Sequence, residues 1–276
     1  MNKLSIERQT QVISALVEGN SIRATCRMTG TAKGTVIRLL ERVGDACARY
    51  QNEALRDLKC ERFQCDEIWA FCHSKQKNVS PEKAGEFGYG DVWTWTAICA
   101  DCKLIPSWLV GLRDAGYAYE FISDLANRLS GRVQLTTDGL KSYLTAIEDT
   151  FGANIDYAML VKLYGETPEG EKRYSPAQCI GTRSDVIQGQ PDPAHVSTSY
   201  VERQNLTMRM SMRRFTRLTN AFSKKVENLE HAVALHFMHY NFVRIHQTLK
   251  TTPAVKAGVT DKWWTIRDIV ELAESN

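Results

Sequence analysis

A chain of 276 residues with 43% hydrophobic and 24% charged residues has the composition of a globular protein, with room for one large domain and a small one. No stretch approaches the roughly 18 consecutive apolar residues that cross a bilayer, and the N-terminal MNKLSIERQT lacks the apolar core of a signal peptide. The composition therefore argues against a membrane or secreted protein, and we expect a cytoplasmic one.

The net charge of +3 conceals an uneven distribution along the chain. Residues 1–62 carry 11 Lys or Arg against 7 acidic residues, and residues 199–250 carry 9 against 3. The segment 63–198 carries 12 against 18. Basic segments are candidates for contact with phosphates, and an acidic centre is compatible with the same partner if metal ions neutralise it.

The first 43 residues show the apolar spacing of three short helices. Gly19 and Asn20 end the first helix, Ser21 caps the second, and Gly30 forms a turn before the third. This arrangement indicates a helix-turn-helix, whose last helix enters the major groove of DNA. A three-helix packing or dimerisation module is the alternative. In the helix-turn-helix interpretation, four residues are placed to meet DNA: Thr31, Lys33, Thr35 and Arg38.

Residues 44–60 continue as a helix that is polar enough to be a connector. We place the domain boundary near Lys59. The expected organisation is a helix-turn-helix domain with its connector over 1–58, followed by a second domain over 59–276.

From Phe63 onward the apolar pattern becomes that of an α/β domain. Three strands come first, with a loop excursion over 77–91. Residues 165–198 show little periodicity, so we expect them to form a long insertion or lid. The expected strands are 63–72, 92–100, 103–111, 132–139 and 155–164, and the expected helices among them are 115–129 and 140–151.

The order of these elements is that of the ribonuclease H-like fold, a mixed sheet flanked by helices. In that fold the first and fourth strands are neighbours, so an acid in the first strand lies beside an acid at the end of the fourth. Asp66 and Asp138 occupy these two positions.

The segment 199–225 contains one acidic residue, Glu202, among seven Lys or Arg residues. On a helix, Glu202, Arg209 and Arg213 fall within about 20° of one line. A carboxylate that faces DNA is repelled by it unless a divalent metal lies between them, so Glu202 requires further acids to complete an oxygen-ligand site. A solvated basic helix with one incidental acid is the alternative. An apolar stripe lies roughly 100° from the charged line and comprises Val201, Met208, Met212 and Phe215.

Phosphodiester cleavage with two magnesium ions needs about three carboxylates that hold the ions roughly 3.5–4 Å apart. Asp66, Asp138 and Glu202 meet this need. We expect them to be both the catalytic residues and the metal ligands, with Mg²⁺ as the cofactor and Mn²⁺ as a substitute. Four basic side chains are expected to hold the phosphate backbone: Arg203, Arg209, Arg213 and Lys224.

The eight cysteines are irregularly spaced, and a chain of this size does not need disulfides, so reduced thiols are expected. Cys99 and Cys102 form the single CxxC motif. A structural zinc site needs two further ligands at suitable spacing, and none stands nearby in the sequence. We therefore do not expect zinc there.

Three motifs surround the acids: QCDEIWAF at Asp66, LTTDGLKSY at Asp138 and YVERQNLTMRMSMRRFTRLTNAFSKKVENLEHAV at Glu202. Together they resemble the DDE transposases of bacterial insertion sequences, most closely the family named for insertion sequence one. The resemblance spans roughly residues 63–258. It implies a DNA transposase that cleaves transposon ends and joins the released 3′-hydroxyl to target DNA. It also implies DNA partners, no membrane, and a homo-oligomer on DNA.

Two features depart from that family. Asp138 and Glu202 are 64 positions apart, a wider gap than usual, which supports an insertion. Glu171, 33 positions after Asp138, has the spacing of retroviral integrases and is the alternative third acid. The zinc ribbon that often precedes the family's helix-turn-helix has no counterpart here, so the helix-turn-helix alone would bind the ends.

Two other functions stay open: a catalytically silent, transposase-derived DNA-binding regulator, and a ribonuclease or junction nuclease.

Overall fold

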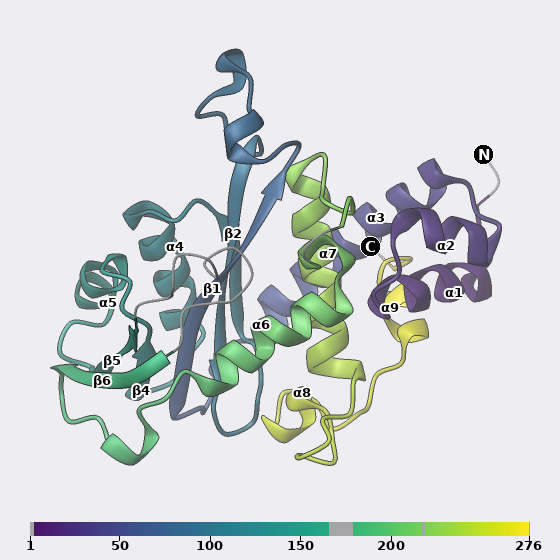
Figure 1. Cartoon of the computed structure of the whole chain (residues 1–276). Helices are drawn as coiled ribbons and strands as arrows, with labels where there is room; N and C mark the ends of the chain where they lie inside the picture. The colour runs from purple at the N-terminus through teal and green to yellow at the C-terminus, as the bar shows by residue number, and fades with distance from the viewer. Residues whose placement is uncertain (1–2, 166–178, 217–218, 276) are drawn as a thin grey trace.

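The computed structural model describes residues 3–165, 179–216 and 219–275, and it shows a central mixed sheet between two layers of helices (Figure 1). Helices α4 (Ala115–Ala126) and α5 (Ser142–Phe151) pack on one face of the sheet. Helices α6 (Ser199–Ser211) and α7 (Val226–Met238) pack on the other. The predicted α/β class with a mixed sheet flanked by helices is confirmed.

The sheet has the strand order β3-β2-β1-β4-β5-β6. β1 pairs antiparallel with β2 and parallel with β4, and β4 pairs parallel with β5. The outer pairs, β2 with β3 and β5 with β6, are antiparallel. The first and fourth strands are therefore neighbours, as predicted. The strands are β1 (Arg62–Cys72), β2 (Gly90–Cys99), β3 (Ser107–Gly111), β4 (Val133–Thr137), β5 (Ile155–Tyr164) and β6 (Cys179–Gln188).

The alternation of side chains along β1 decides which residues face which layer. Phe63 and Cys65 belong to the core that includes α4 and α5, whereas Ile68 belongs to the core formed with α6 and α7. Gln64 and Asp66 are in phase with Ile68. They therefore lie on the face of the sheet that α6 crosses.

The N-terminal helices are α1 (Ile6–Val17), α2 (Ile22–Thr29) and α3 (Lys33–Ala54). The Ser21 hydroxyl caps α2 by accepting a hydrogen bond from the Ala24 N–H, as the sequence predicted. Gly30 follows with a φ of 61°, the left-handed conformation that favours glycine after a helix. α3 then runs without a break through most of the predicted connector.

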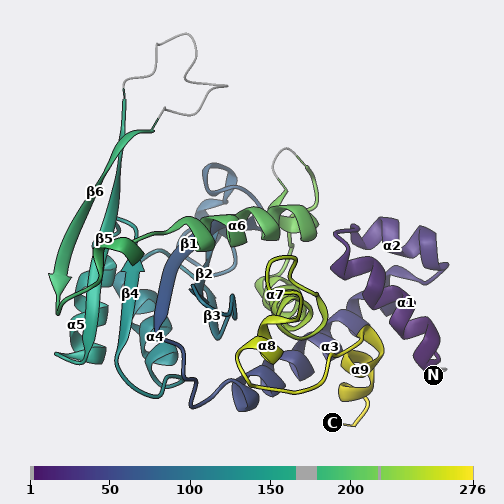
Figure 2. The same ribbon diagram turned by 90° about the horizontal axis from the view of Figure 1, so that it is seen from below.

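The second half of α3 packs tightly against α7, so the connector is not a free linker. Gly44 is necessary at the closest approach, because a Cβ there would lie 2.5 Å from the Cβ of His231. The Gln51 side chain also donates to the Ala234 carbonyl at 3.0 Å. Near the C-terminus, α9 (Ile266–Leu272) packs on α1 and α3, as Figure 2 shows.

The sequence of residues 224–246 predicts one long helix, but the helix is shorter in the structure. α7 ends at Met238 and continues as a π-helical turn, His239–Val243. Within this turn Asn241 accepts from the Ile105 N–H at 3.0 Å and donates to the Ile105 carbonyl at 2.8 Å, which fastens the turn to the segment before β3. α8 (Pro253–Lys256) follows. The described residues also form four 3₁₀ turns: Gln76–Asn78, Pro81–Lys83, Pro193–His195 and Arg213–Phe215.

The expectation of an irregular insertion over 165–198 was wrong for β6, which pairs antiparallel with β5. The sequence pattern hid this strand because its apolar side chains, Ile180, Val186 and Ile187, are exposed rather than buried on one face. Glu171 lies outside the described residues. Among the helices that are described, none is long and apolar enough to cross a membrane.

Candidate active site

Two carboxylates meet where β1 and β4 lie side by side. Cys65 pairs with Thr137, so Asp66 and Asp138 follow at the next position of the two parallel strands. One carboxylate oxygen from each of Asp66, Glu67 and Asp138 lies within 4.8 Å of the other two. The predicted meeting of Asp66 and Asp138 is thus present.

Glu67 is an acid that the sequence interpretation did not single out. Its side chain is 1% exposed and pairs with the guanidinium of Arg113 at 2.5 Å. The Tyr143 hydroxyl donates to its other oxygen at 3.2 Å. Burial and the charge of Asp138 raise the pKa of Glu67, although Arg113 opposes the shift. The sequence signal that could have found Glu67 is a second acid directly after Asp66, in a strand of mainly apolar residues.

The first turn of α6 is anchored directly on β1. The Gln64 Oε1 accepts hydrogen bonds from the backbone N–H groups of Tyr200 at 2.8 Å and Val201 at 3.2 Å. Helix N-termini leave such N–H groups without partners within the helix, so Gln64 satisfies two of them. Figure 2 shows α6 lying across β1. One turn further along, the Asn205 amide donates to Asp66 Oδ2 at 2.8 Å.

Glu202 lies in the first turn of α6 and is outside the group of acids whose oxygens all lie within 4.8 Å. One of its oxygens accepts from the Thr198 hydroxyl, and the other pairs with the Lys162 ammonium of β5, both at 2.5 Å. Its negative charge also contributes to the raised pKa of Asp66. In this arrangement the charge of Glu202 acts on Asp66, while the Lys162 ammonium neutralises Glu202.

The cluster of Asp66, Glu67 and Asp138 carries more negative charge than the neighbouring Arg113 can neutralise. Burial raises the pKa of Asp66 to about 7, and the charges of Glu67 and Asp138 add to the effect. The nearest guanidinium atom of Arg113 lies 3.9 Å from Asp138. A bound divalent cation would supply the missing positive charge.

The donor set fits a hard divalent cation. Carboxylate oxygens are the ligands that Mg²⁺ and Mn²⁺ prefer. The carbonyl oxygen of the Asn205 side chain is buried beside Asp66 and has no hydrogen-bond partner among the described residues, so a further oxygen is available. Asp66, Asp138 and Glu202, with Glu67 and Asn205 beside them, could hold such an ion.

The apolar stripe of residues 199–225 behaves as predicted, because Val201, Met208, Met212 and Phe215 are all buried. The predicted line of Glu202, Arg209 and Arg213 is broken, because α6 ends at Ser211 and the backbone of Met212 is extended. Arg213 therefore starts a 3₁₀ turn instead of continuing the line of Glu202 and Arg209. Three of the four predicted phosphate-binding side chains are exposed, namely Arg203, Arg213 and Lys224, and Arg209 is half-buried.

The residues predicted to meet DNA from α3 differ in exposure. Lys33 and Arg38 are exposed, and Thr35 is half-buried. Thr31 is only 7% exposed, and its hydroxyl donates to the Thr29 carbonyl at 3.4 Å. The Thr31 side chain thus forms a hydrogen bond within the turn before α3. Unlike Lys33 and Arg38, Thr31 is not exposed.

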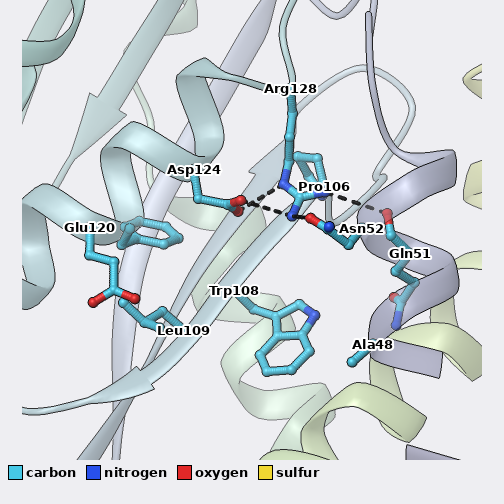
Figure 3. Close-up of a pocket in the computed structure, with 10 residues that line it drawn as sticks. Ala48, Gln51, Asn52, Pro106, Trp108, Leu109, Glu120, Asp124 and Arg128 are labelled. Carbon is cyan, nitrogen blue, oxygen red and sulfur yellow. Dashed lines mark hydrogen bonds and ion pairs between the residues drawn. The ribbon is translucent and has the colours of Figure 1, made fainter. Parts of the chain in front are cut away.

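A cavity of about 200 Å³ lies elsewhere, between α3, β3 and α4 (Figure 3). Inside it, Arg128 donates two 2.8 Å hydrogen bonds to Asp124, and it also reaches the Gln51 carbonyl at 3.4 Å and the Asn52 side chain at 3.0 Å. Arg128 and its partners satisfy one another, whereas the buried Gln51 Oε1 has no hydrogen-bond partner among the described residues. The cavity is a packing junction and contains none of the acids described above.

The sequence matches no protein-family model and no curated protein. Among solved structures, the chain is similar to one described as the cryo-EM structure of a piggyBac transposase synaptic complex with hairpin DNA. The identity is 10%, the TM-score is 0.42, and the match covers 98% of this chain and 70% of that chain. At this TM-score the likeness assigns neither a fold family nor a function.

Proposed function

We propose that this protein is a DNA transposase with a ribonuclease H-like catalytic domain, which cleaves transposon ends and joins them to target DNA. One observation carries the proposal: Asp66 and Asp138 meet on adjacent parallel strands beneath α6, the helix that bears Glu202. The three motifs around these acids and their resemblance to transposases of the insertion sequence one family support it. The exposed Arg203, Arg213 and Lys224 support a DNA substrate.

The chemistry consists of two phosphoryl transfers. In the first, water attacks a phosphorus atom at the transposon end, the P–O3′ bond breaks, and a free 3′-hydroxyl is released. In the second, that hydroxyl attacks a phosphodiester of the target, a new P–O bond forms, and one target strand is cut. Each bond that breaks is replaced by one of the same kind, so neither an energy source nor a covalent enzyme intermediate is required.

The roles of the residues follow from their positions. Asp66, Asp138 and Glu202 would hold two Mg²⁺ ions, which when bound lower the pKa of the attacking water and stabilise the leaving oxygen. Asn205 orients Asp66 through its 2.8 Å hydrogen bond. Without metal, the pKa of Asp66 of about 7 leaves this side chain only partly ionised at neutral pH, and Lys162 balances Glu202. Joining two ends requires more than one copy of the chain, so we expect a homo-oligomer on DNA.

The ion pair between Lys162 and Glu202 favours a second candidate, a DNA-binding regulator derived from a transposase. In such a protein Lys162 would replace the metal as the permanent partner of Glu202. The two candidates agree on DNA binding and differ on cleavage.

The deciding experiment incubates the purified protein with DNA that flanks its coding sequence, in Mg²⁺, and maps the nicks. Asp66→Asn, Asp138→Asn and Glu202→Gln should each abolish nicking and leave DNA affinity nearly intact, because each removes a metal ligand and no basic contact. Asp149→Asn, an exposed acid on α5, is the matched control. If Glu202→Gln nicks normally and Glu171→Gln does not, Glu171 is the third acid. No nicking by the unaltered protein would favour the regulator.

A further inference from the structure

Three cysteines from separate parts of the chain converge away from the acidic site. Cys60 lies between α3 and β1, Cys99 ends β2, and Cys102 lies in the turn before β3. Their sulfur atoms lie within 4.8 Å of one another, and those of Cys60 and Cys102 are 3.7 Å apart. Cys99 and Cys102 are buried and Cys60 is half-buried.

The turn that holds Cys99 and Cys102 is shaped to bring their sulfurs together. The Cys102 N–H points to the Cys99 sulfur at 3.5 Å, and the Lys103 N–H donates to the Cys99 carbonyl at 3.0 Å. Lys103 has a φ of 62°, a left-handed conformation that costs energy for any residue with a Cβ. Backbone strain of this kind is common at ligand-binding sites.

The third sulfur is fixed by the backbone on both sides of Cys60. Leu58 donates to the Arg128 carbonyl at 2.9 Å and accepts from the Ser130 N–H at 3.0 Å. Arg62 begins β1, and its carbonyl accepts from the Ala100 N–H at 2.8 Å. Cys60 is therefore held in place by the folded sheet.

We propose that Cys60, Cys99 and Cys102 bind a thiophilic divalent cation, Zn²⁺, as a structural site. Tetrahedral zinc with Zn–S bonds of about 2.3 Å places its sulfur ligands about 3.8 Å apart, close to the 3.7 Å between Cys60 and Cys102. We assign the fourth position to Asp101, whose Oδ2 lies 4.0 Å from the Cys99 sulfur and whose Oδ1 pairs with Arg62. Its carboxylate lies outside the group of three sulfurs, so the side chain has to turn toward them when the ion binds. Binding releases the three thiol protons to solvent.

The site ties the start of β1 to the turn between β2 and β3. Asp66 lies on β1, six positions after Cys60. The bound ion would therefore fix the position of the strand that carries the first catalytic acid. The inference does not depend on the proposed function, because it rests on sulfur positions and not on the carboxylates.

The test uses the full-length protein, purified with reductant and stripped of metal, and titrates it with Co²⁺ and then Zn²⁺. Thiolate ligands give Co²⁺ a near-ultraviolet charge-transfer band, which the oxygen ligands of the acidic site cannot produce. We expect one equivalent of Co²⁺ to generate this band and Zn²⁺ to abolish it by displacement. The absence of a band, or a Cys60–Cys102 disulfide found in protein purified without reductant, would overturn the proposal.

Serine variants identify the ligands. Cys60→Ser, Cys99→Ser and Cys102→Ser should each weaken Co²⁺ binding more than about 10-fold. Loss of a residue that merely supports a metal ligand already lowers metal affinity by about that factor, and loss of the ligand itself should cost more. Cys179→Ser, an exposed cysteine on β6, is the control and should bind normally. Asp101→Asn should keep the charge-transfer band and alter the visible spectrum of the cobalt. Equal binding by wild type and all three serine variants would refute the assignment even if one variant folded poorly.

Discussion

Asp66 is expected to destabilise the metal-free protein at neutral pH. Its pKa rises from an ordinary 3.8 to about 7 in the folded chain, mainly through burial and the charge of Glu67. The unfolded chain therefore loses this proton at lower pH than the folded chain does. The stabilising contribution of protonated Asp66 is present below about pH 4 and is lost as the pH rises to about 7.

Asp66→Asn should therefore raise the free energy of unfolding at pH 8 by on the order of 3 kcal/mol without metal. At pH 4 the variant and the wild type should differ little. Mg²⁺ should stabilise the wild type at pH 8 and have a much smaller effect on the variant. Urea unfolding at both pH values, with and without Mg²⁺, measures this. Equal stability at pH 8 would mean that Asp66 is not buried among like charges.

Asn205 is the residue that connects α6 to Asp66. Asn205→Ala removes the 2.8 Å hydrogen bond and leaves the Asp66 carboxylate without its orienting donor. We expect cleavage to fall about 10- to 100-fold and the Mg²⁺ requirement to rise, with DNA affinity unchanged. Nicking rates over a Mg²⁺ titration measure both. Leu206→Ala, an exposed neighbour on α6, is the control, and an equal loss there would show that α6 itself had been disturbed.

At the scale of elements, the position of α6 depends on Gln64. Replacing its side chain with Leu leaves two N–H groups of α6 without an acceptor, the buried one of Val201 and the part-buried one of Tyr200, at a cost of about 1–3 kcal/mol. Gln64→Leu should lower both the unfolding temperature and the cleavage rate. Gln64→Glu keeps an acceptor at the helix N-terminus, where negative charge is favourable, and should recover most of the stability. If Leu and Glu behave alike, the anchor lies elsewhere.

The sequence could predict those elements whose burial leaves a pattern. β1, β4 and β5 alternate or run apolar because they lie in the middle of the sheet, and the stripe of α6 is visible because it packs. β6 was missed because its apolar residues are exposed at the edge of the sheet. The two sites differ in the same way. The pairing of Asp66 with Asp138 could be predicted from the strand order, whereas the meeting of Cys60 with Cys99 and Cys102 depends on the register of the sheet, which the sequence does not reveal.

At the scale of the whole molecule, the two ends of the chain are packed together. α9 lies against α1, Arg42 pairs with Glu274 at 2.7 Å, and Arg267 lies 3.6 Å from Glu7. α3 in turn packs along α7, whose other side covers the sheet. The polar composition of residues 44–60 predicted a connector. Composition alone does not reveal that Gly44 and Gln51 face α7.

This packing changes how DNA recognition must be separated from catalysis. A chain that starts near Arg56 would lose α1 to α3 and expose the side of α7 that includes Ala234, Leu235 and Met238. We expect that fragment to aggregate or to unfold without cooperativity, as thermal unfolding followed by circular dichroism would show. Cooperative unfolding near the temperature of the full chain would instead establish two independent domains.

Point substitution should succeed where truncation fails. Arg38→Ala removes an exposed cation from α3, and it should cost on the order of 1–3 kcal/mol of binding to transposon ends if Arg38 reads a guanine. Binding to scrambled DNA should change little, and nicking in Mg²⁺ should continue without preference for the ends. Gel shifts and nicking assays on end-containing and scrambled DNA measure the two effects side by side. Lys256→Ala, an exposed cation on α8, is the control. An unchanged preference in Arg38→Ala and in Lys33→Ala would place specificity in the sheet domain and leave α1 to α3 as a packing or dimerisation module.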